Sequence, residues 1–134
     1  MPTIEYPLVR PYVHGKPLIP VRLVDLESRV WSSSTFALLD TGADVSVFHV
    51  AFGEELGIDF GSIPAGEGIG LGGQFPLRYY VVGLQVGDRL FKARVAFTDA
   101  EWLDYALLGR EGFFDNVQVG LRESAGEFYL KLEP

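Results

Sequence analysis

The sequence contains no cysteine, and this absence excludes several kinds of chemistry. Disulfide bonds, thiol nucleophiles and thiolate zinc sites all require cysteine. Histidine is nearly as scarce, since only His14 and His49 are present and they lie far apart in the chain. A serine–histidine pair or a histidine-rich metal site therefore has few residues to draw on. Carboxylates remain as the candidate catalytic groups.

Positive charge and long apolar runs are also in short supply. The chain has 11 Lys and Arg against 18 Asp and Glu, a formal net charge of −7. Phosphate backbones are bound by clustered Lys and Arg, so nucleic acid is not an expected partner. No segment approaches the roughly 20 apolar residues of a membrane-spanning helix, and residues 1–6 lack the pattern of a signal peptide. We expect a soluble, cytoplasmic protein with no membrane partner.

The residues that are plentiful predict an all-β protein. The length of 134 residues is enough for one domain with a substantial core, over residues 1–134, and too short for two ordinary domains. Sixteen glycines and eight prolines separate short runs of β-branched and aromatic residues. Such spacing is typical of many short strands joined by turns, without long helices.

The same patterns place the individual elements. Residues 1–12 contain three prolines and are expected to form an edge strand or an extended arm. Gly87-Asp88 is expected to turn a hairpin, and Trp31 to be anchored in the core or an interface. Expected strands cover residues 17–26, 35–39, 77–86, 90–97, 105–109, 117–122 and 127–132, and expected short helices cover residues 49–56 and 110–115.

Residues 36–48, FALLDTGADVSVF, stand out from the rest of the chain. An apolar run stops abruptly at Asp40-Thr41-Gly42 and apolar alternation then resumes, so a polar turn is displayed at the end of a buried strand. A catalytic group is presented in this way. Aspartate before Thr-Gly is also a common turn or capping residue, and in isolation that interpretation is favoured. His49 is either a base or simply a surface residue at the start of a short helix.

A second unusual stretch, GEGIGLGG, covers residues 66–73. A phosphate-binding loop is excluded, because no Gly-Lys-Ser/Thr follows and residues 75–86 are rich in strand formers where a helix would be required. The stretch is better explained as a mobile hairpin tip whose glycines let the backbone approach a ligand. An ordinary flexible loop remains the alternative.

Three features therefore follow one another along the chain: residues 38–44 (LLDTGAD), the glycine-rich hairpin, and Leu107-Leu108-Gly109-Arg110 before a short helix. In this order they resemble the retropepsins, the retroviral-type aspartic proteases and their cellular relatives, over roughly residues 17–119. The resemblance implies a closed acid-protease β-barrel with one or two short helices and a flap hairpin. It implies an aspartic endopeptidase that needs no metal and no cofactor.

The resemblance also implies a homodimer. The chain has one Asp-Thr-Gly and about half the length of a pepsin-like enzyme, so two facing carboxylates require two chains, each giving one Asp40. Two carboxyl groups at close range share one proton, as in the well-known aspartic-protease pair. The pair would activate water against a peptide bond in an extended peptide or an unfolded protein segment.

Each matching residue receives a role from the resemblance. The Thr41 hydroxyl would bond across the dimer beneath the carboxylates. Gly42 would allow a tight turn and place its amide near the Asp40 carboxylate. Gly109, at the end of the strand that contains Leu108, would permit packing against the back of the Asp40 loop.

Further residues would shape the substrate cleft. Asp44 and Arg110 match a family ion pair that braces the dimer, and Ala43 and Asp44 would also contact substrate. In viral enzymes the termini interleave to build the dimer sheet, and for residues 1–12 and 128–134 of this chain the question stays open. The expected flap tip, which would close over the peptide, consists of Gly70, Leu71, Gly72 and Gly73.

Two other classes of function are compatible with the sequence. One is a non-catalytic peptide-binding or dimerisation module on the same fold. The other is a small-ligand β-barrel, which has only the glycine-rich loop in its favour.

Overall fold

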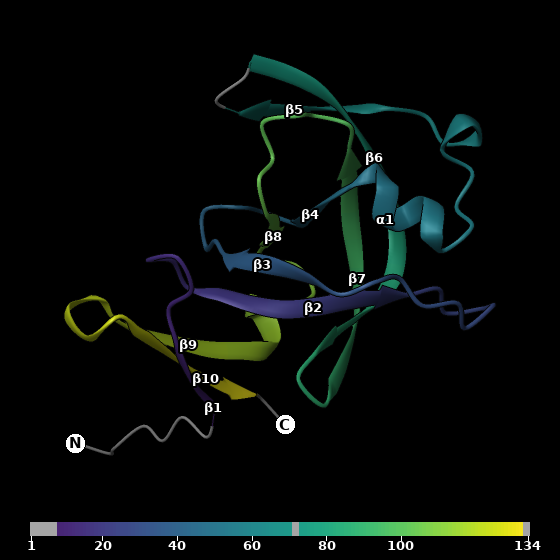
Figure 1. Cartoon of the computed structure of the whole chain (residues 1–134). Coiled ribbons are helices and arrows are strands. Elements are labelled where there is room, and N and C mark those ends of the chain that lie inside the picture. Colours follow the sequence, from purple (N-terminus) through teal and green to yellow (C-terminus); the bar gives the residue numbers. More distant parts are fainter. Residues whose placement is uncertain (1–7, 71–72, 133–134) are drawn as a thin grey trace.

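The computed structural model describes residues 8–70 and 73–132 and consists mainly of strands (Figure 1). Its helical segments are short: α1 (Val50–Glu55) and the 3-10 turns η1 (Phe60–Ser62), η2 (Phe114–Asn116) and η3 (Glu123–Ala125). The strands are β1 (Leu8–Pro11), β2 (Leu18–Val24), β3 (Thr35–Leu39), β4 (Ser46–His49), β5 (Gly66–Gly70), β6 (Gly73–Val86), β7 (Arg89–Thr98), β8 (Ala106–Leu108), β9 (Val117–Arg122) and β10 (Glu127–Leu132).

The larger sheet closes on itself. Its strand order is β2-β3-β8-β4-β7-β6-β5, and β2 also pairs with β6, so the strands from β2 to β6 in this order form a closed barrel. β5 extends beyond the ring and pairs with the first part of β6 as a hairpin. The expected closed all-β barrel is confirmed.

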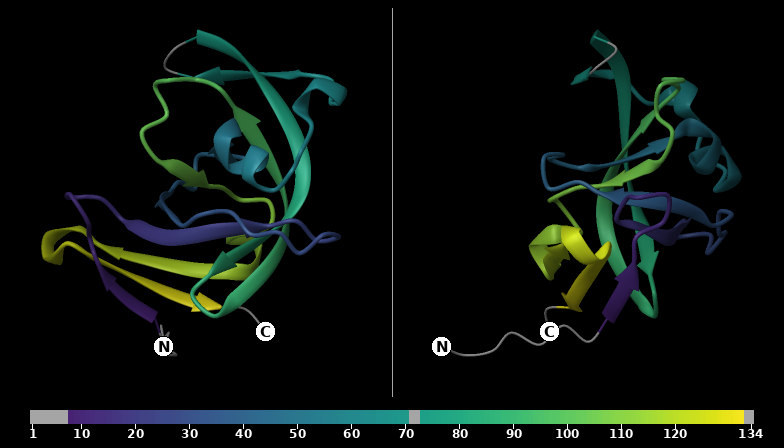
Figure 2. Two further views of the ribbon diagram at one scale, coloured as in Figure 1. Left: turned by 45° about the vertical axis from the view of Figure 1, so that its right-hand side comes forward. Right: turned by 60° about the vertical axis from the view of Figure 1, so that its left-hand side comes forward.

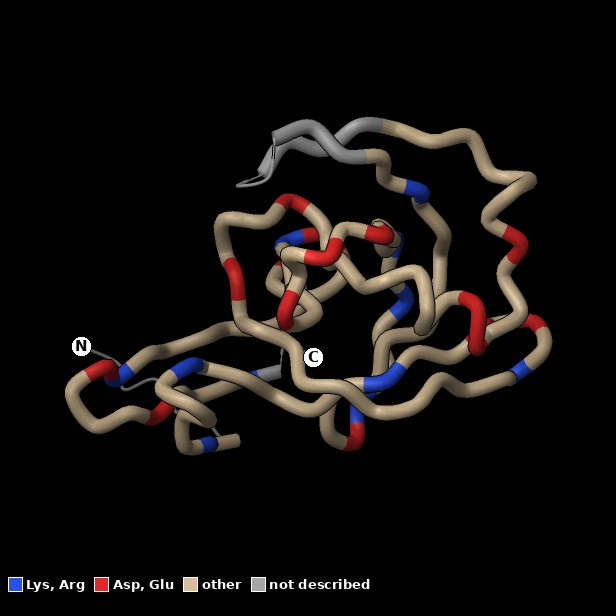
Figure 3. The backbone as a smooth tube through the Cα atoms, turned by 45° about the horizontal axis from the view of Figure 1, so that its top comes forward, with Lys and Arg blue, Asp and Glu red and all other residues tan. Residues whose placement is uncertain are grey.

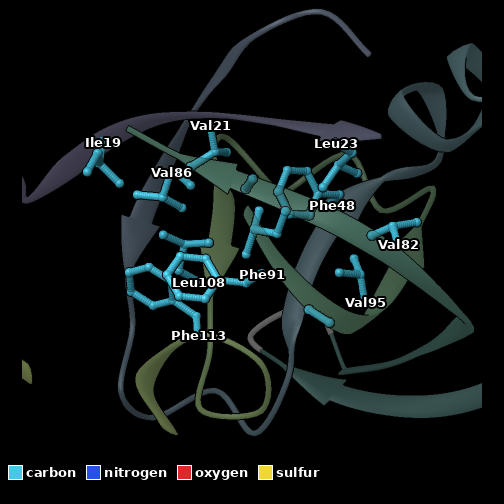
Figure 4. Close-up of a cluster of buried hydrophobic side chains, with 14 of the residues drawn as sticks. Ile19, Val21, Leu23, Phe48, Val82, Val86, Phe91, Val95, Leu108 and Phe113 are labelled. Carbon is cyan, nitrogen blue, oxygen red and sulfur yellow. The ribbon is translucent and has the colours of Figure 1, made fainter. Parts of the chain in front are cut away.

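The barrel interior is filled by side chains that alternate along the strands. In β2, Ile19, Val21 and Leu23 are buried while Pro20 and Arg22 between them are exposed, as the two-residue period of a strand requires. Figure 4 shows side chains from several strands converging, among them Leu23, Phe48 and Val82, which are 0 % exposed. Each such burial contributes about 1.5–3 kcal/mol to folding.

A separate sheet with the order β1-β10-β9 lies across one end of the barrel, opposite the β5–β6 hairpin (Figure 2). Phe128 and Leu130 of β10 are 0 % exposed and belong to the barrel core. β1 pairs with β10 of the same chain, with Leu8 opposite Leu130. The edge strand expected near the N-terminus is thus present from Leu8, and residues 1–7 and 133–134 lie outside the described residues.

One expectation about local structure was wrong, and of the two positions expected for Trp31 the core is excluded. Residues 110–115 do not form a helix, because Glu111 bridges Val45 and Gly112 adopts a φ of +83° against Ala93; only the 3-10 turn at Phe114–Asn116 is helical. Trp31 does not lie in the core. It is 39 % exposed, and its ring is covered by the Arg22 guanidinium at 4.1 Å from the ring centroid.

Charged residues are distributed along the described chain. Figure 3 shows Lys and Arg spread over many segments, with Asp and Glu between them. Within residues 8–70 and 73–132, no helix is long and apolar enough to cross a bilayer.

Asp25, just after β2, is a buried carboxylate that is 9 % exposed. The Ser28 amide and hydroxyl donate to its Oδ2 at 2.8 and 2.9 Å. These hydrogen bonds hold the pKa of Asp25 below its usual value, with a smaller contribution from the Tyr80 hydroxyl, although burial acts in the opposite direction. The charged form of Asp25 therefore stabilises the turn between β2 and β3.

We expect Asp25→Asn to lower the free energy of unfolding by about 1–2 kcal/mol near neutral pH, because a charged acceptor makes stronger hydrogen bonds than an amide. Since folding lowers this pKa, the stabilisation is complete above the ordinary aspartate pKa of about 3.9 and disappears as pH falls through the lower folded value. Urea denaturation over a pH series should show the gap between wild type and variant closing in acid. Asp88→Asn, in the exposed β6–β7 turn, is the control. A gap independent of pH would contradict this assignment.

Candidate active site

Asp40 directly follows β3, at a point where two parallel strands stop side by side. β3 pairs in parallel with β8, and the last pair joins Leu39 and Leu108. The Asp40 amide continues the pairing by donating to the Leu108 carbonyl at 3.0 Å. Leu108 is 0 % exposed, so the backbone before Asp40 is anchored to the core.

The Asp40 side chain takes part in a tight turn. The Ala43 amide donates to the Asp40 carbonyl at 3.1 Å, and the Gly42 amide donates to Asp40 Oδ1 at 3.0 Å. A Cβ atom at Gly42 would lie 3.2 Å from Asp40 Oδ1, so glycine gives the carboxylate its room. Oδ2 has no hydrogen-bond partner in the part of the chain that the structure describes. The turn role of aspartate and a free carboxylate oxygen are therefore both present.

Gly109 lies against the back of this turn. A Cβ atom there would stand 2.4 Å from the Val45 carbonyl carbon and oxygen and 2.8 Å from the Ala43 oxygen. These are backbone atoms that cannot move aside at low cost. The Arg110 amide donates to the Ala43 carbonyl at 2.9 Å, which ties the two segments together. Only glycine permits this close approach.

Ser46 is a support residue that the sequence analysis did not single out. Its side chain is 0 % exposed, and its Oγ accepts a hydrogen bond from the Gly109 amide at 3.0 Å. The sequence carried a signal, because Ser46 falls on the same face of β4 as the buried Phe48. A hydroxyl at a core-facing position needs a hydrogen-bond partner.

The predicted ion pair between Asp44 and Arg110 is not formed. Among the described residues, Arg110 Nε instead donates to the Thr41 carbonyl at 2.8 Å, and no ion pair joins it to Asp44. The neighbouring ion pair is Arg94–Glu111, at 2.9 Å and half-exposed. Arg110 thus stabilises the Asp40 turn by a hydrogen bond to the backbone carbonyl of Thr41.

Three groups of Thr41 and Asp44 in this loop remain without partners in residues 8–70 and 73–132. The exposed Thr41 hydroxyl makes no hydrogen bond. The Asp44 amide and carboxylate also make none, although the Asp44 carbonyl accepts from the Glu111 amide at 2.9 Å. These polar groups are available to a ligand or to another chain.

The glycine-rich stretch forms the β5–β6 hairpin. Its pairing ends at Gly70 opposite Gly73, while Leu71 and Gly72 lie outside the described residues. In Figures 1 and 2 the hairpin projects above the segment that joins β3 to β4, which contains the Asp40 turn. The backbone therefore places the two unusual sequence stretches on one side of the barrel.

His49 has a local structural partner. Its Nδ1 accepts from the Ala51 amide at 3.1 Å and caps α1, which explains its position better than a role as a base. In the described ranges no group of three His, Cys, Asp or Glu residues is arranged to hold a metal ion.

The sequence matches no known family model, and it matches no curated protein. The structure is similar to the crystal structure of a retropepsin-like aspartic protease from Rickettsia conorii, with a TM-score of 0.69. The similarity covers 92 % of this chain and 97 % of that protein, at 14 % sequence identity. The fold is retropepsin-like.

In this retropepsin-like fold, the closed barrel, the short α1 and the β5–β6 hairpin agree with the expectation from sequence. The Asp40 turn lies at the end of the barrel wall formed by β3 and β8. At 14 % identity the similarity establishes the architecture, and the chemistry must be argued from the residues themselves.

Proposed function

We propose that this chain is an aspartic endopeptidase that works as a homodimer, with one Asp40 carboxylate from each copy. One observation carries the proposal: Asp40 directly follows β3 of a retropepsin-like barrel, with Oδ1 bound to the Gly42 amide and Oδ2 without a partner in the described chain. A single carboxylate cannot act as acid and base at once. Two copies around a two-fold axis supply both roles.

The chemistry follows from two carboxyl groups at short range. Both cannot ionise at low cost, so the pair holds one proton, and aspartic proteases are the standard case. The ionised member takes a proton from a water molecule between the two. The protonated member hydrogen-bonds the peptide carbonyl oxygen while the water attacks its carbon, so the pair acts as general base and general acid.

The surroundings of Asp40 support this role. The partner-free Thr41 hydroxyl can bond across the two-fold axis. The hydrogen bond from Arg110 to the Thr41 carbonyl holds the backbone of Thr41 in place. Gly42 and Gly109 keep the turn compact. The carboxylate would thus be held rigidly before substrate arrives, as efficient general acid–base catalysis requires.

Substrate would bind as an extended strand between the turn and the β5–β6 hairpin. Next to Ala43, the free amide and carboxylate of Asp44 can form hydrogen bonds with the backbone of the substrate. The hairpin would act as a flap that closes over the peptide and excludes water. Its tip would be Gly70, Leu71, Gly72 and Gly73.

A non-catalytic peptide-binding or dimerisation module is the second candidate. It is favoured by the missing ion pair between Asp44 and Arg110, a departure from the arrangement that the protease resemblance implies. Such a module would bind extended peptides without cleaving them.

The direct test is incubation of the protein with a mixture of unstructured peptides from mildly acidic to neutral pH. We expect cleavage that a statine-type inhibitor blocks, because its hydroxyl mimics the attacking water between two carboxyl groups. Mass spectrometry of the products would give the cleavage preference. Binding of the peptides without any cleavage at protein concentrations where the dimer forms would favour the second candidate.

A further inference from the structure

β9 leaves one edge of the three-stranded sheet open. It pairs with β10 along its whole length, Val117–Arg122, and no described strand lies on its other side. The opposite edge of the sheet, β1, contains Arg10 and ends at Pro11, both of which discourage further strand pairing. β9 has no proline and carries charge only at Arg122. Its free edge is therefore the more receptive to another strand.

The apolar face of the sheet also extends past the barrel. The register places Val117, Val119 and Leu121 on the same face as the buried Phe128 and Leu130. Val117 is 5 % exposed and Leu121 is 59 % exposed, although Leu121 pairs with Phe128. The chain itself covers the start of this apolar row and leaves its end in solvent.

The open edge and the Asp40 turn lie on one side of the molecule. In the right-hand view of Figure 2, β9 is the outermost strand of its sheet on the side where the segment between β3 and β4 projects. In Figure 1 the three-stranded sheet lies below, the segment between β3 and β4 lies in the middle, and the β5–β6 hairpin lies above. A partner placed against β9 would therefore also reach the Asp40 turn.

We infer that β9 is the docking edge for a second copy of this chain, whose own β9 pairs with it in antiparallel fashion. The inference rests on the proposed function, since the Asp40 site is incomplete without that copy. The two sheets would join into one continuous sheet, and Leu121 would be covered. Each β1 stays paired with the β10 of its own chain, in contrast to the interleaved termini of the viral enzymes.

Self-pairing of β9 satisfies the demands of a two-fold axis. An antiparallel pair of identical strands brings the end of one strand beside the start of the other, so Arg122 of one copy approaches the exposed Asp115 that precedes β9 in the other. A stable interface buries about 800 Å² on each partner. Six residues of strand edge provide less than that, so the contact must continue to the Asp40 turn.

Sedimentation velocity of Leu121→Glu and Val9→Glu tests this edge. Both residues are exposed apolar positions in the same sheet, 59 % and 46 %, at opposite edges. We expect Leu121→Glu to weaken dimerisation at least about 100-fold, because each copy would bury an unpaired glutamate in the interface. Val9→Glu should leave the dissociation constant within about threefold of wild type. Equal effects of the two variants, or a wild type that stays monomeric, would overturn the inference.

Single-cysteine crosslinking gives a second, independent readout. The chain has no cysteine, so each variant carries one thiol. A disulfide forms across the axis where two Cα atoms lie within about 7 Å. Under mild oxidation we expect a covalent dimer from at least one of Gln118→Cys, Val119→Cys and Gly120→Cys, and none from Arg10→Cys on β1. Crosslinking through β1 alone would establish interleaved termini and reject the β9 edge.

The two proposals can fail separately, because sedimentation and crosslinking do not require activity. A β9-crosslinked dimer that never cleaves peptides would support the docking edge and contradict the protease. Peptide cleavage by Leu121→Glu at the wild-type rate, at low protein concentration, would contradict the docking edge and leave the protease standing.

Discussion

Replacing Asp40 by asparagine is expected to lower the rate of peptide cleavage by about 10⁴-fold, the upper end of what general acid–base catalysis contributes. The amide can neither take a proton from water nor carry the proton that the pair shares. The variant separates chemistry from structure, because the asparagine Oδ1 can still accept the Gly42 amide that now bonds Asp40 Oδ1 at 3.0 Å. The turn and the fold should therefore persist.

Cleavage assays of the two proteins at matched dimer concentration would measure this effect, with circular dichroism and sedimentation as checks on fold and assembly. Asp44→Asn is the matched control, since it removes a negative charge from the same loop, four residues after Asp40. We expect Asp44→Asn to act mainly on KM, through substrate binding. Undiminished cleavage by Asp40→Asn would exclude the proposed mechanism.

Replacing Gly109 by alanine is expected to lower the free energy of unfolding by about 3 kcal/mol or more, at the upper end of the cost of overpacking. The new methyl group would meet the Val45 backbone at 2.4 Å and the Ala43 oxygen at 2.8 Å, and neither strand segment can retreat without losing its pairing with Arg110 and Glu111. For a domain of this size the loss corresponds to a fall in melting temperature of about 10 °C.

Thermal and urea denaturation followed by circular dichroism would measure this loss. Gly61→Ala is the control, because a Cβ atom there approaches only the exposed Asp59 side chain, at 3.3 Å. Gly61→Ala should change stability by less than about 1 kcal/mol. If Gly109→Ala were as stable as Gly61→Ala, the packing of the two loops would be looser than the structure indicates.

Local sequence patterns were sufficient for most of the strands. The predicted strand at residues 35–39 coincides with β3, and the Gly87-Asp88 turn joins β6 to β7 as expected. Such patterns are readable because side-chain alternation and turn residues act over a few positions. The helix expected at residues 110–115 failed for the opposite reason, since Glu111 is paired with Val45, a residue distant in sequence.

The candidate site was foreseen in its parts and not in its connections. Asp40-Thr41-Gly42 and Gly109 could be recognised from residue types and order. The hydrogen bond from the Gly109 amide to Ser46 and that from Arg110 to the Thr41 carbonyl could not, because each depends on which loops meet in space. A charge pair such as Asp44 and Arg110 is easily proposed from sequence, yet a guanidinium has several donors and binds the acceptor that packing brings nearest.

The sequence by itself determined that this protein is rich in β-strands, with a polar turn directly after one of them and with carboxylates as its candidate chemistry. The strand before that turn was expected to be buried, but only Ala37 of β3 is. Tertiary structure alone decided that β3 and β8 end together, that Gly109 closes on the Asp40 turn, and that β1 and β10 pair within one chain while β9 stays open. The division has one physical cause. Strand and turn preferences are properties of neighbouring residues, whereas strand order, closure and free edges depend on how distant segments share one core.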